Sequence, residues 1–136
     1  MSKWCRVLGV LLVLWLSLTT GCQSGDRKMP AMHPVVGKVF YKTGQPLTGG
    51  SVKFQSATDT SLSTAGEIQA DGSFTLSTFA NSARVKGAPP GEYRVTVVPP
   101  LGAEHAVQPI TLPKPYKVEA RDNMFTITLD KPAPKQ

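Results

Sequence analysis

Hydrophobic and polar residues alternate in short runs from Val35 onward, and glycine, proline and aspartate separate the runs. Such alternation is typical of strands with one face in a core and the other in water. In residues 51–55, for example, Val52 and Phe54 are expected to point inward and Lys53 outward. The pattern predicts seven strands, at residues 35–41, 51–55, 67–69, 74–76, 92–98, 116–120 and 123–129.

The connections between these runs have the residues that turns require. Asp71-Gly72 separates two short alternating runs and predicts a tight hairpin loop, because glycine adopts positive φ without steric strain. Residues 42–50 and 87–91 are also rich in glycine and proline. Residues 99–115 hold five prolines with no sustained period, so we expect a surface loop there. The strand at residues 116–120 follows this loop, and its pairing partner stays open.

This order of strands, without a run of helical period, defines the expected fold class. It predicts an all-β domain at residues 35–130, built as a seven-stranded antiparallel two-sheet sandwich. The last residues, 131–136, are polar and proline-containing, and we expect a disordered tail.

Residues 1–21 have the three-part layout of a secretory signal peptide. Lys3 and Arg6 precede an apolar run at residues 7–18, and small residues stand directly before Cys22. The apolar run is well short of the about 20 residues that a membrane-spanning helix needs. The sequence therefore predicts an N-terminal signal helix that is removed after export.

Cys22 is the candidate site of a covalent modification. Residues 18–22 (LTTGC) resemble the bacterial lipobox, in which the cysteine thiol receives a diacylglyceryl group and the chain is cut just before it; Thr19 departs from the usual leucine. The resemblance implies that Cys22 is lipidated and carries fatty acids such as palmitate. The alternative is ordinary cleavage that leaves a free Cys22. Cys5 leaves with the signal peptide, so an intrachain disulfide is excluded in the mature chain.

Residues 22–34 are polar and interrupted by prolines, which predicts a flexible tether between a membrane anchor and the domain. His33 lies in this stretch and is expected to be solvated. Gln23 follows the cysteine in place of aspartate, and among lipoproteins of double-membrane bacteria this resembles those of the outer membrane. We therefore expect export across the inner membrane and lipid anchoring in the cell envelope, with the outer membrane favoured over the inner.

The chain has a formal net charge of +6. Two of its 15 lysines and arginines, Lys3 and Arg6, would leave with the signal peptide, so 13 basic side chains remain against 9 acidic ones. These bases are scattered singly along the strands and do not form one block. This predicts solvated faces with some attraction to anionic lipid headgroups, and no nucleic-acid partner.

Five short motifs follow one another along the predicted domain. They are VGKV at residues 36–39, GQPL at 44–47, GSVKF at 50–54, DGSFTL at 71–76 and GAPPGEYRVTV at 87–97. In this order they resemble the carboxypeptidase-regulatory-like, transthyretin-like domains of bacterial lipoproteins. The resemblance implies an accessory β-sandwich without catalytic residues and without a cofactor.

Two enzyme activities of related sandwiches can be weighed against the histidines and tyrosines. A hydroxyisourate hydrolase uses histidines together with a Tyr-Arg-Gly-Ser end, whereas His33 and His105 lie outside the predicted strands and the chain ends in Pro-Lys-Gln. An intradiol-dioxygenase iron site needs two histidines and two tyrosines in one cluster. Tyr41 and Tyr93 are better explained as core aromatics, and Tyr116 belongs to the sixth predicted strand, so we expect no metal site.

A third chemical possibility is an intramolecular isopeptide bond between Lys38 on the first strand and Asn123 on the last. Such a bond needs a buried lysine beside an acidic group. The alternation of residues 35–41 instead predicts that Lys38 faces solvent.

The sequence thus predicts a non-enzymatic, lipid-anchored cell-envelope protein with a structural or protein-binding role. An envelope protein partner would meet a sheet edge or the loop at residues 99–115. The alternative is a carbohydrate- or polymer-binding module at the cell surface. Such modules usually present exposed aromatic rings, and both tryptophans, Trp4 and Trp15, lie within the signal peptide.

Overall fold

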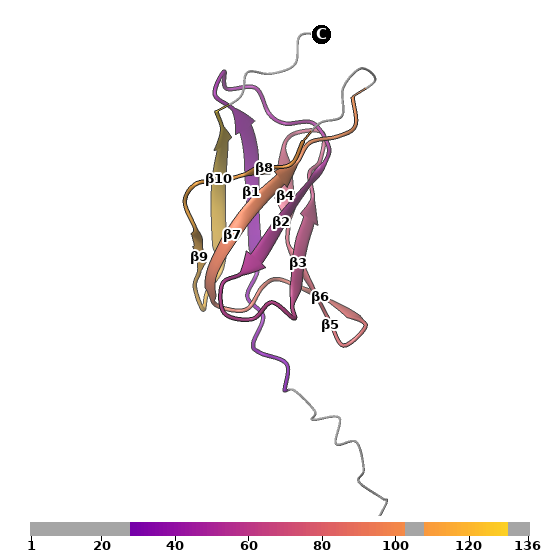
Figure 1. Ribbon diagram of the computed structural model, residues 1–136, viewed down its shortest axis with the longest axis vertical. Coiled ribbons are helices and arrows are strands. Elements are labelled where there is room, and N and C mark those ends of the chain that lie inside the picture. The colour runs from indigo at the N-terminus through magenta and orange to yellow at the C-terminus, as the bar shows by residue number, and fades with distance from the viewer. Residues whose placement is uncertain (1–27, 103–107, 131–136) are drawn as a thin grey trace, which may run out of the picture.

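The structure is a computed structural model that describes residues 28–102 and 108–130. Within these residues it is all-β and contains no helix, and its ten strands form two sheets that pack face to face (Figure 1). The prediction of an all-β, two-sheet domain is therefore confirmed, whereas the predicted number of seven strands is wrong. The strands are β1 (Val35–Tyr41), β2 (Ser51–Ser56), β3 (Ser63–Glu67), β4 (Ser73–Thr75), β5 (Ser77–Ala80), β6 (Ala83–Lys86), β7 (Gly91–Val98), β8 (Ile110–Thr111), β9 (Tyr116–Val118) and β10 (Asn123–Leu129).

The smaller sheet has three strands in the order β10-β1-β4. β1 pairs with β4 antiparallel but with β10 parallel, Val35 lying opposite Asn123 and Tyr41 opposite Leu129. The prediction of a wholly antiparallel sandwich is therefore wrong at this pair. The reason is topological, since the first and last strands are joined only through the rest of the domain and no tight hairpin sets their relative direction.

The larger sheet has the order β6-β5-β3-β2-β7-β8, and β9 also pairs with β7. β9 runs antiparallel to β7, which answers the open question about the sixth predicted strand. The loop expected at residues 99–115 is partly wrong, because Ile110 and Thr111 form β8 against Val97 and Thr96 of β7. A two-residue strand is too short for an alternating pattern to reveal it.

The turn at Asp71-Gly72 is confirmed, but its two arms do not continue as one hairpin. Gly72 has φ +80°, and the N–H of Gln69 donates to the carbonyl of Ser73 at 2.8 Å. Beyond a single bridge between Ile68 and Phe74, β3 belongs to the larger sheet and β4 to the smaller one. The chain then crosses between sheets at Leu76, so that β4 and β5 are successive parts of one extended segment in different sheets.

The β5–β6 hairpin was absent from the sequence prediction. Its two-residue turn is Asn81-Ser82, and both residues have positive φ, 48° and 64°. This turn lacks the glycine that usually follows asparagine in a two-residue hairpin loop. The hairpin projects at the end of the domain where the described chain begins (Figure 1).

The core lies between the two sheets and is centred on Phe54, which is 1% exposed. Its ring centroid lies 6.3 Å from that of Phe74 in β4 and 6.0 Å from that of Phe125 in β10, both in the opposite sheet. Aromatic pairs at such separations stabilise a core beyond the area they bury. The inward positions predicted for Val52 and Phe54, and the outward position of Lys53, are confirmed.

Gly37 in β1 lies against both β10 and β4 with no room for a side chain, and its substitution tests this packing. A Cβ there would come within 2.5 Å of both the carbonyl oxygen of Phe125 and the Phe74 ring. We expect Gly37→Ala to lower the free energy of unfolding by about 1–3 kcal/mol, because a backbone atom must shift. Gly102→Ala, where nothing lies within 4 Å, is the control and should change it by less than about 0.5 kcal/mol in urea unfolding. Equal effects of the two would contradict the packing described.

Candidate functional site

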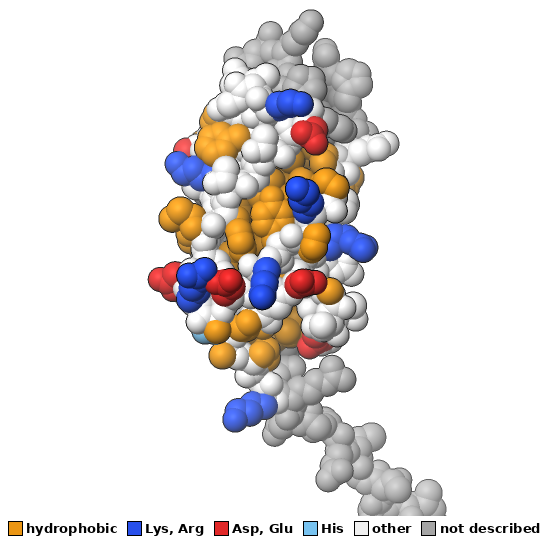
Figure 2. Space-filling view, turned by 90° about the vertical axis from the view of Figure 1, so that its left-hand side faces the viewer, with side chains coloured by type: hydrophobic (Ala, Val, Ile, Leu, Met, Phe, Trp, Pro, Cys, Tyr) orange, Lys and Arg blue, Asp and Glu red, His pale blue; other side chains and the backbone are white. Residues whose placement is uncertain are grey.

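One side of the sandwich exposes an edge of each sheet. β10 borders the smaller sheet, and β8 with β9 borders the larger one. Figure 2 views this side, where hydrophobic side chains gather in the middle and charged side chains surround them. We call it the open side of the sandwich.

The edge formed by β8 and β9 is interrupted by a bulge at residues 112–115 (LPKP). The N–H of Leu112 still donates to the carbonyl of Val95 at 2.9 Å, and pairing resumes only at Tyr116, which lies opposite Tyr93. Pro113 and Pro115 have no N–H to donate, and Lys114 between them is exposed. The bulge therefore carries the chain away from the sheet edge.

A hollow of about 400 Å³ lies between this bulge and the outer side of β10. Its walls combine apolar side chains with threonine side chains, and the charged residues Lys114 and Asp130 also line it. Tyr116 contributes to the hollow and packs its ring against Phe125 at 5.3 Å, edge to face. The lining residues are Ile110, Thr111, Leu112, Pro113, Lys114, Tyr116, Thr126, Thr128 and Asp130.

Alternate backbone groups of β10 point away from β1. The N–H of Asn123 donates to Pro34 and the carbonyl of Leu129 accepts from Lys42, so odd-numbered residues face β1. Backbone groups alternate in direction along a strand, so the N–H and C=O of the even-numbered residues 124, 126 and 128 face the open side. No other described strand pairs with this edge.

The other sheet edges in the described part of the chain have features that discourage pairing with another strand. β6 has only four residues, among them Arg84 and Lys86, and β4 has three. β8 and β9 are broken by the proline-containing bulge. Short length, charged side chains, prolines and bulges are the devices that protect sheet edges. β10 has seven residues and contains neither proline nor charge.

Two exposed apolar side chains flank the β10 edge on the outer face of the smaller sheet. Met124 is 83% exposed and its cross-strand partner Val36 is 38% exposed. They lie side by side, since paired residues of neighbouring strands project to the same face. A strand added to β10 would cover part of this apolar pair.

The predicted lipidation site, Cys22, and the loop histidine, His105, lie outside the described residues. His33 is held by its backbone, which exchanges two hydrogen bonds with Ala88, at 2.9 and 3.0 Å. Its side chain is half-buried. The end of the expected tether thus lies against the domain at His33.

The structure does not bring the three tyrosines together. Tyr93 is buried, and its hydroxyl donates to the carbonyl of Pro89 at 2.8 Å. Burial, and after it the nearby charge of Asp59, raises the pKa of Tyr93 to about 12. Tyr116 is its cross-strand neighbour, whereas Tyr41 ends β1 at the far end from His33. Tyr93 therefore has the surroundings of a neutral, hydrogen-bonded core residue.

Lys38 and Asn123 do not face each other. Lys38 is exposed, as the sequence predicted, and lies opposite Thr126, while Asn123 lies opposite Val35. The Asn123 side chain closes the turn after β9, accepting from the N–H of Glu119 at 2.9 Å and donating to its carbonyl at 3.0 Å. Asn123 is thus a turn residue.

Among the residues that the structure describes, no group of three or more histidine, cysteine or acidic side chains is placed to hold a metal ion. The same residues include no helix long and apolar enough to cross a membrane. Comparison with models of known protein families found no match, and comparison with curated proteins found no relative.

The direction of the β10 backbone can be tested by proline substitution at two adjacent positions. In Thr126→Pro the lost N–H faces the open side, so we expect a loss of less than about 1 kcal/mol in the free energy of unfolding. In Ile127→Pro the lost N–H faces β1, and the expected cost is about 3 kcal/mol or more. Denaturant unfolding of both variants measures the difference. A Thr126→Pro variant as unstable as Ile127→Pro would show that the assigned direction is wrong.

Proposed function

We propose that this protein is a non-enzymatic, lipid-anchored domain of the cell envelope that binds an extended segment of a protein partner along β10. The observation that carries the proposal is the unpaired edge of β10, the longest edge strand in the described part of the chain, which contains neither proline nor charge. An extended peptide adds to such an edge by main-chain hydrogen bonds, and nearby pockets select its side chains. The hollow beside β10 and the Val36–Met124 pair are suited to receive them.

The sequence supports the location and the family within this proposal. The lipobox-like residues before Cys22 support export and anchoring, with the outer membrane favoured. The ordered motifs from residue 36 to residue 97 support membership of the carboxypeptidase-regulatory-like group, whose domains are accessory and carry no catalytic residues. The alternating strands and Gly-Pro turns of that resemblance agree with the all-β architecture.

The carbohydrate-binding alternative has less support from the exposed aromatic side chains. Phe79 is the aromatic residue among the large exposed hydrophobics of the described chain, at 47% exposure. The Arg84 guanidinium already stands over its ring, 5.6 Å from the centroid. This ring is therefore partly covered as a stacking surface for a sugar.

Site-specific crosslinking in intact envelopes tests the partner. A photocrosslinking residue at Met124 should capture a discrete partner, because this position flanks the β10 edge. The same residue at Lys42, which is exposed outside that edge, is the control and should not capture it.

Thr126→Pro, combined with the photocrosslinker at Met124, then tests the mode of binding. It removes one edge N–H that an added strand would use, so we expect at least a tenfold loss of the crosslinked product at equal protein level, which corresponds to about 1.4 kcal/mol. Thr126→Ser keeps the N–H and should retain the product. Undiminished capture by the proline variant would rule out strand addition at β10.

Fatty-acid labelling tests the anchor independently of any partner. The wild-type chain should incorporate labelled fatty acid and fractionate with membranes, and Cys22→Ala should do neither. The physical reason is that several acyl chains on one cysteine bind stably to a bilayer, whereas one chain alone is marginal. Equal labelling of the wild type and Cys22→Ala would place any lipid on another residue.

A further inference from the structure

The outer face of the larger sheet collects basic side chains that are far apart in the sequence. Cross-strand partners define two adjacent rows on this face, which lies toward the viewer in Figure 1. The first row is Arg84, Phe79, Ser63, Gln55 and Arg94, and the second is Lys86, Ser77, Ala65, Lys53 and Thr96.

We call the four cations of these rows, Arg84, Arg94, Lys86 and Lys53, the basic band. All four are exposed, and neither row contains a carboxylate. The carboxylates that share this face lie outside the rows, Glu67 at the end of β3 and Glu92 opposite Lys117. The ion pair found in the described part of the chain joins Arg121 to Glu119, neither of which belongs to the band.

The spacing of the basic band is too wide for all four cations to contact one small anion. Neighbouring strands lie about 4.8 Å apart, so Arg84 and Arg94, four strands apart, are separated by about 19 Å. Apart from Phe79, the residues between them in the first row are small or polar, which leaves this part of the face flat. Such a face fits an extended anionic surface, whose charges repeat over similar distances.

Two further observations select a lipid surface as the occupant. Phe79 is 47% exposed within the first row even though the guanidinium of Arg84, its cross-strand partner on the same face, stands over its ring. An exposed aromatic ring among cations is typical of proteins that contact the boundary between headgroups and acyl chains.

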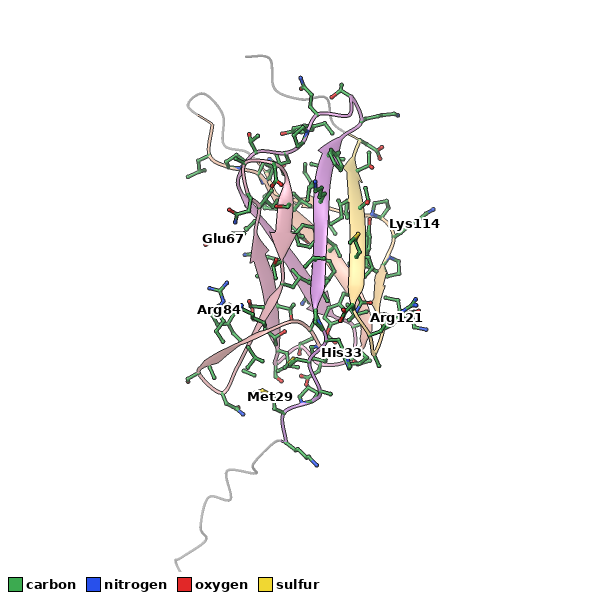
Figure 3. All side chains as sticks on the ribbon, turned by 180° about the vertical axis from the view of Figure 1, so that it is seen from behind. Met29, His33, Glu67, Arg84, Lys114 and Arg121 are labelled. Carbon is green, nitrogen blue, oxygen red and sulfur yellow. The ribbon has the colours of Figure 1, made fainter. Side chains whose placement is uncertain are left out.

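The second observation is the position of Lys28, at which the described chain begins. Residues 28–30 and the β5–β6 turn line a common hollow, so the start of the chain lies beside the hairpin that carries Phe79 and Arg84. Figure 3 shows Met29 and Arg84 at this end of the domain. Cys22 is six residues before Lys28, and six residues of extended chain span at most about 20 Å.

We propose that the basic band, with Phe79, lies against the anionic lipid surface to which the domain is anchored. This inference deepens the proposed function and, in the cell, rests on the lipid anchor at Cys22. It fixes an orientation: the larger sheet faces the membrane, and the β10 edge, on the open side, stays accessible to a partner.

Vesicle binding tests the proposal without the anchor. The chain from residue 22 onward, which contains every described residue, is prepared with Cys22→Ser and mixed with phosphatidylcholine vesicles that contain or lack phosphatidylglycerol. We expect binding only with phosphatidylglycerol. Each basic residue near such a surface contributes about fivefold in partitioning, so Arg84→Gln with Lys86→Gln, or Lys53→Gln with Arg94→Gln, should weaken it on the order of twentyfold.

The matched control removes two positive charges from a part of the domain outside the basic band. Lys38 and Lys42 are exposed on β1 and the turn after it, in the smaller sheet's half of the domain. Lys38→Gln with Lys42→Gln should weaken binding by less than about threefold, because only the long-range field changes. If this control weakens binding as much as the band variants do, net charge alone is responsible and the proposal fails. Because these chains carry no lipid, failure here leaves the fatty-acid labelling result unaffected.

A tryptophan reporter distinguishes a lipid surface from a soluble polyanion. The chain from residue 22 has no tryptophan, so Phe79→Trp introduces a single one. Its emission should shift to shorter wavelength with phosphatidylglycerol vesicles and not with inorganic polyphosphate. Met124→Trp, on the outer face of the smaller sheet, should show no shift. Binding of polyphosphate without binding of vesicles, or a shift at residue 124 in place of residue 79, would overturn the proposal.

Discussion

The packing of Phe54 against aromatic rings of both sheets is the interaction on which the domain depends. Its ring meets Phe74 and Phe125 of the smaller sheet and, within its own sheet, Tyr93 and Tyr116 at 5.9 and 6.3 Å. The smaller sheet has only three strands, and a sheet of that size needs a second layer to bury its apolar face. The larger sheet supplies this layer, and the aromatic cluster joins the two sheets. Within the cluster, Tyr116 of β9 contacts Phe125 of β10 beside the hollow on the open side.

The sequence predicted those features that depend on local pattern. Alternation predicted both end residues of β1. It also predicted that Val52 and Phe54 point inward and that Lys38 is exposed, because burial of one strand face imposes a period of two. The same alternation could not show that β10 runs parallel to β1, since the pairing of distant strands depends on the whole topology. The β5–β6 hairpin escaped prediction because Asn81 and Ser82 adopt positive φ without glycine.

The candidate sites, like the fold, depend partly on local sequence pattern and partly on the tertiary arrangement of the strands. The open edge of β10 can be recognised only when the partners of every strand are known, although its lack of charge and proline is visible in residues 123–129. The basic residues are scattered along the sequence, but they are not scattered in space. Strand register brings Arg84, Lys53 and Arg94 from three separate strands onto one face.

The edges at β4, β6 and β8–β9 have features that discourage pairing with another strand, so the unpaired edge of β10 needs an explanation. An unprotected edge promotes aggregation, and natural sheets carry charges, prolines or bulges to prevent it. This chain has such devices at β6 and at the β8–β9 bulge, so its sequence is capable of them, and a single lysine or proline at residue 126 would protect β10 as well. The proposed addition of a strand accounts for an unpaired edge of this length beside a hollow that apolar and threonine side chains line. A membrane-facing larger sheet is compatible with this pairing, because the outer face of that sheet and the β10 edge belong to different sides of the sandwich.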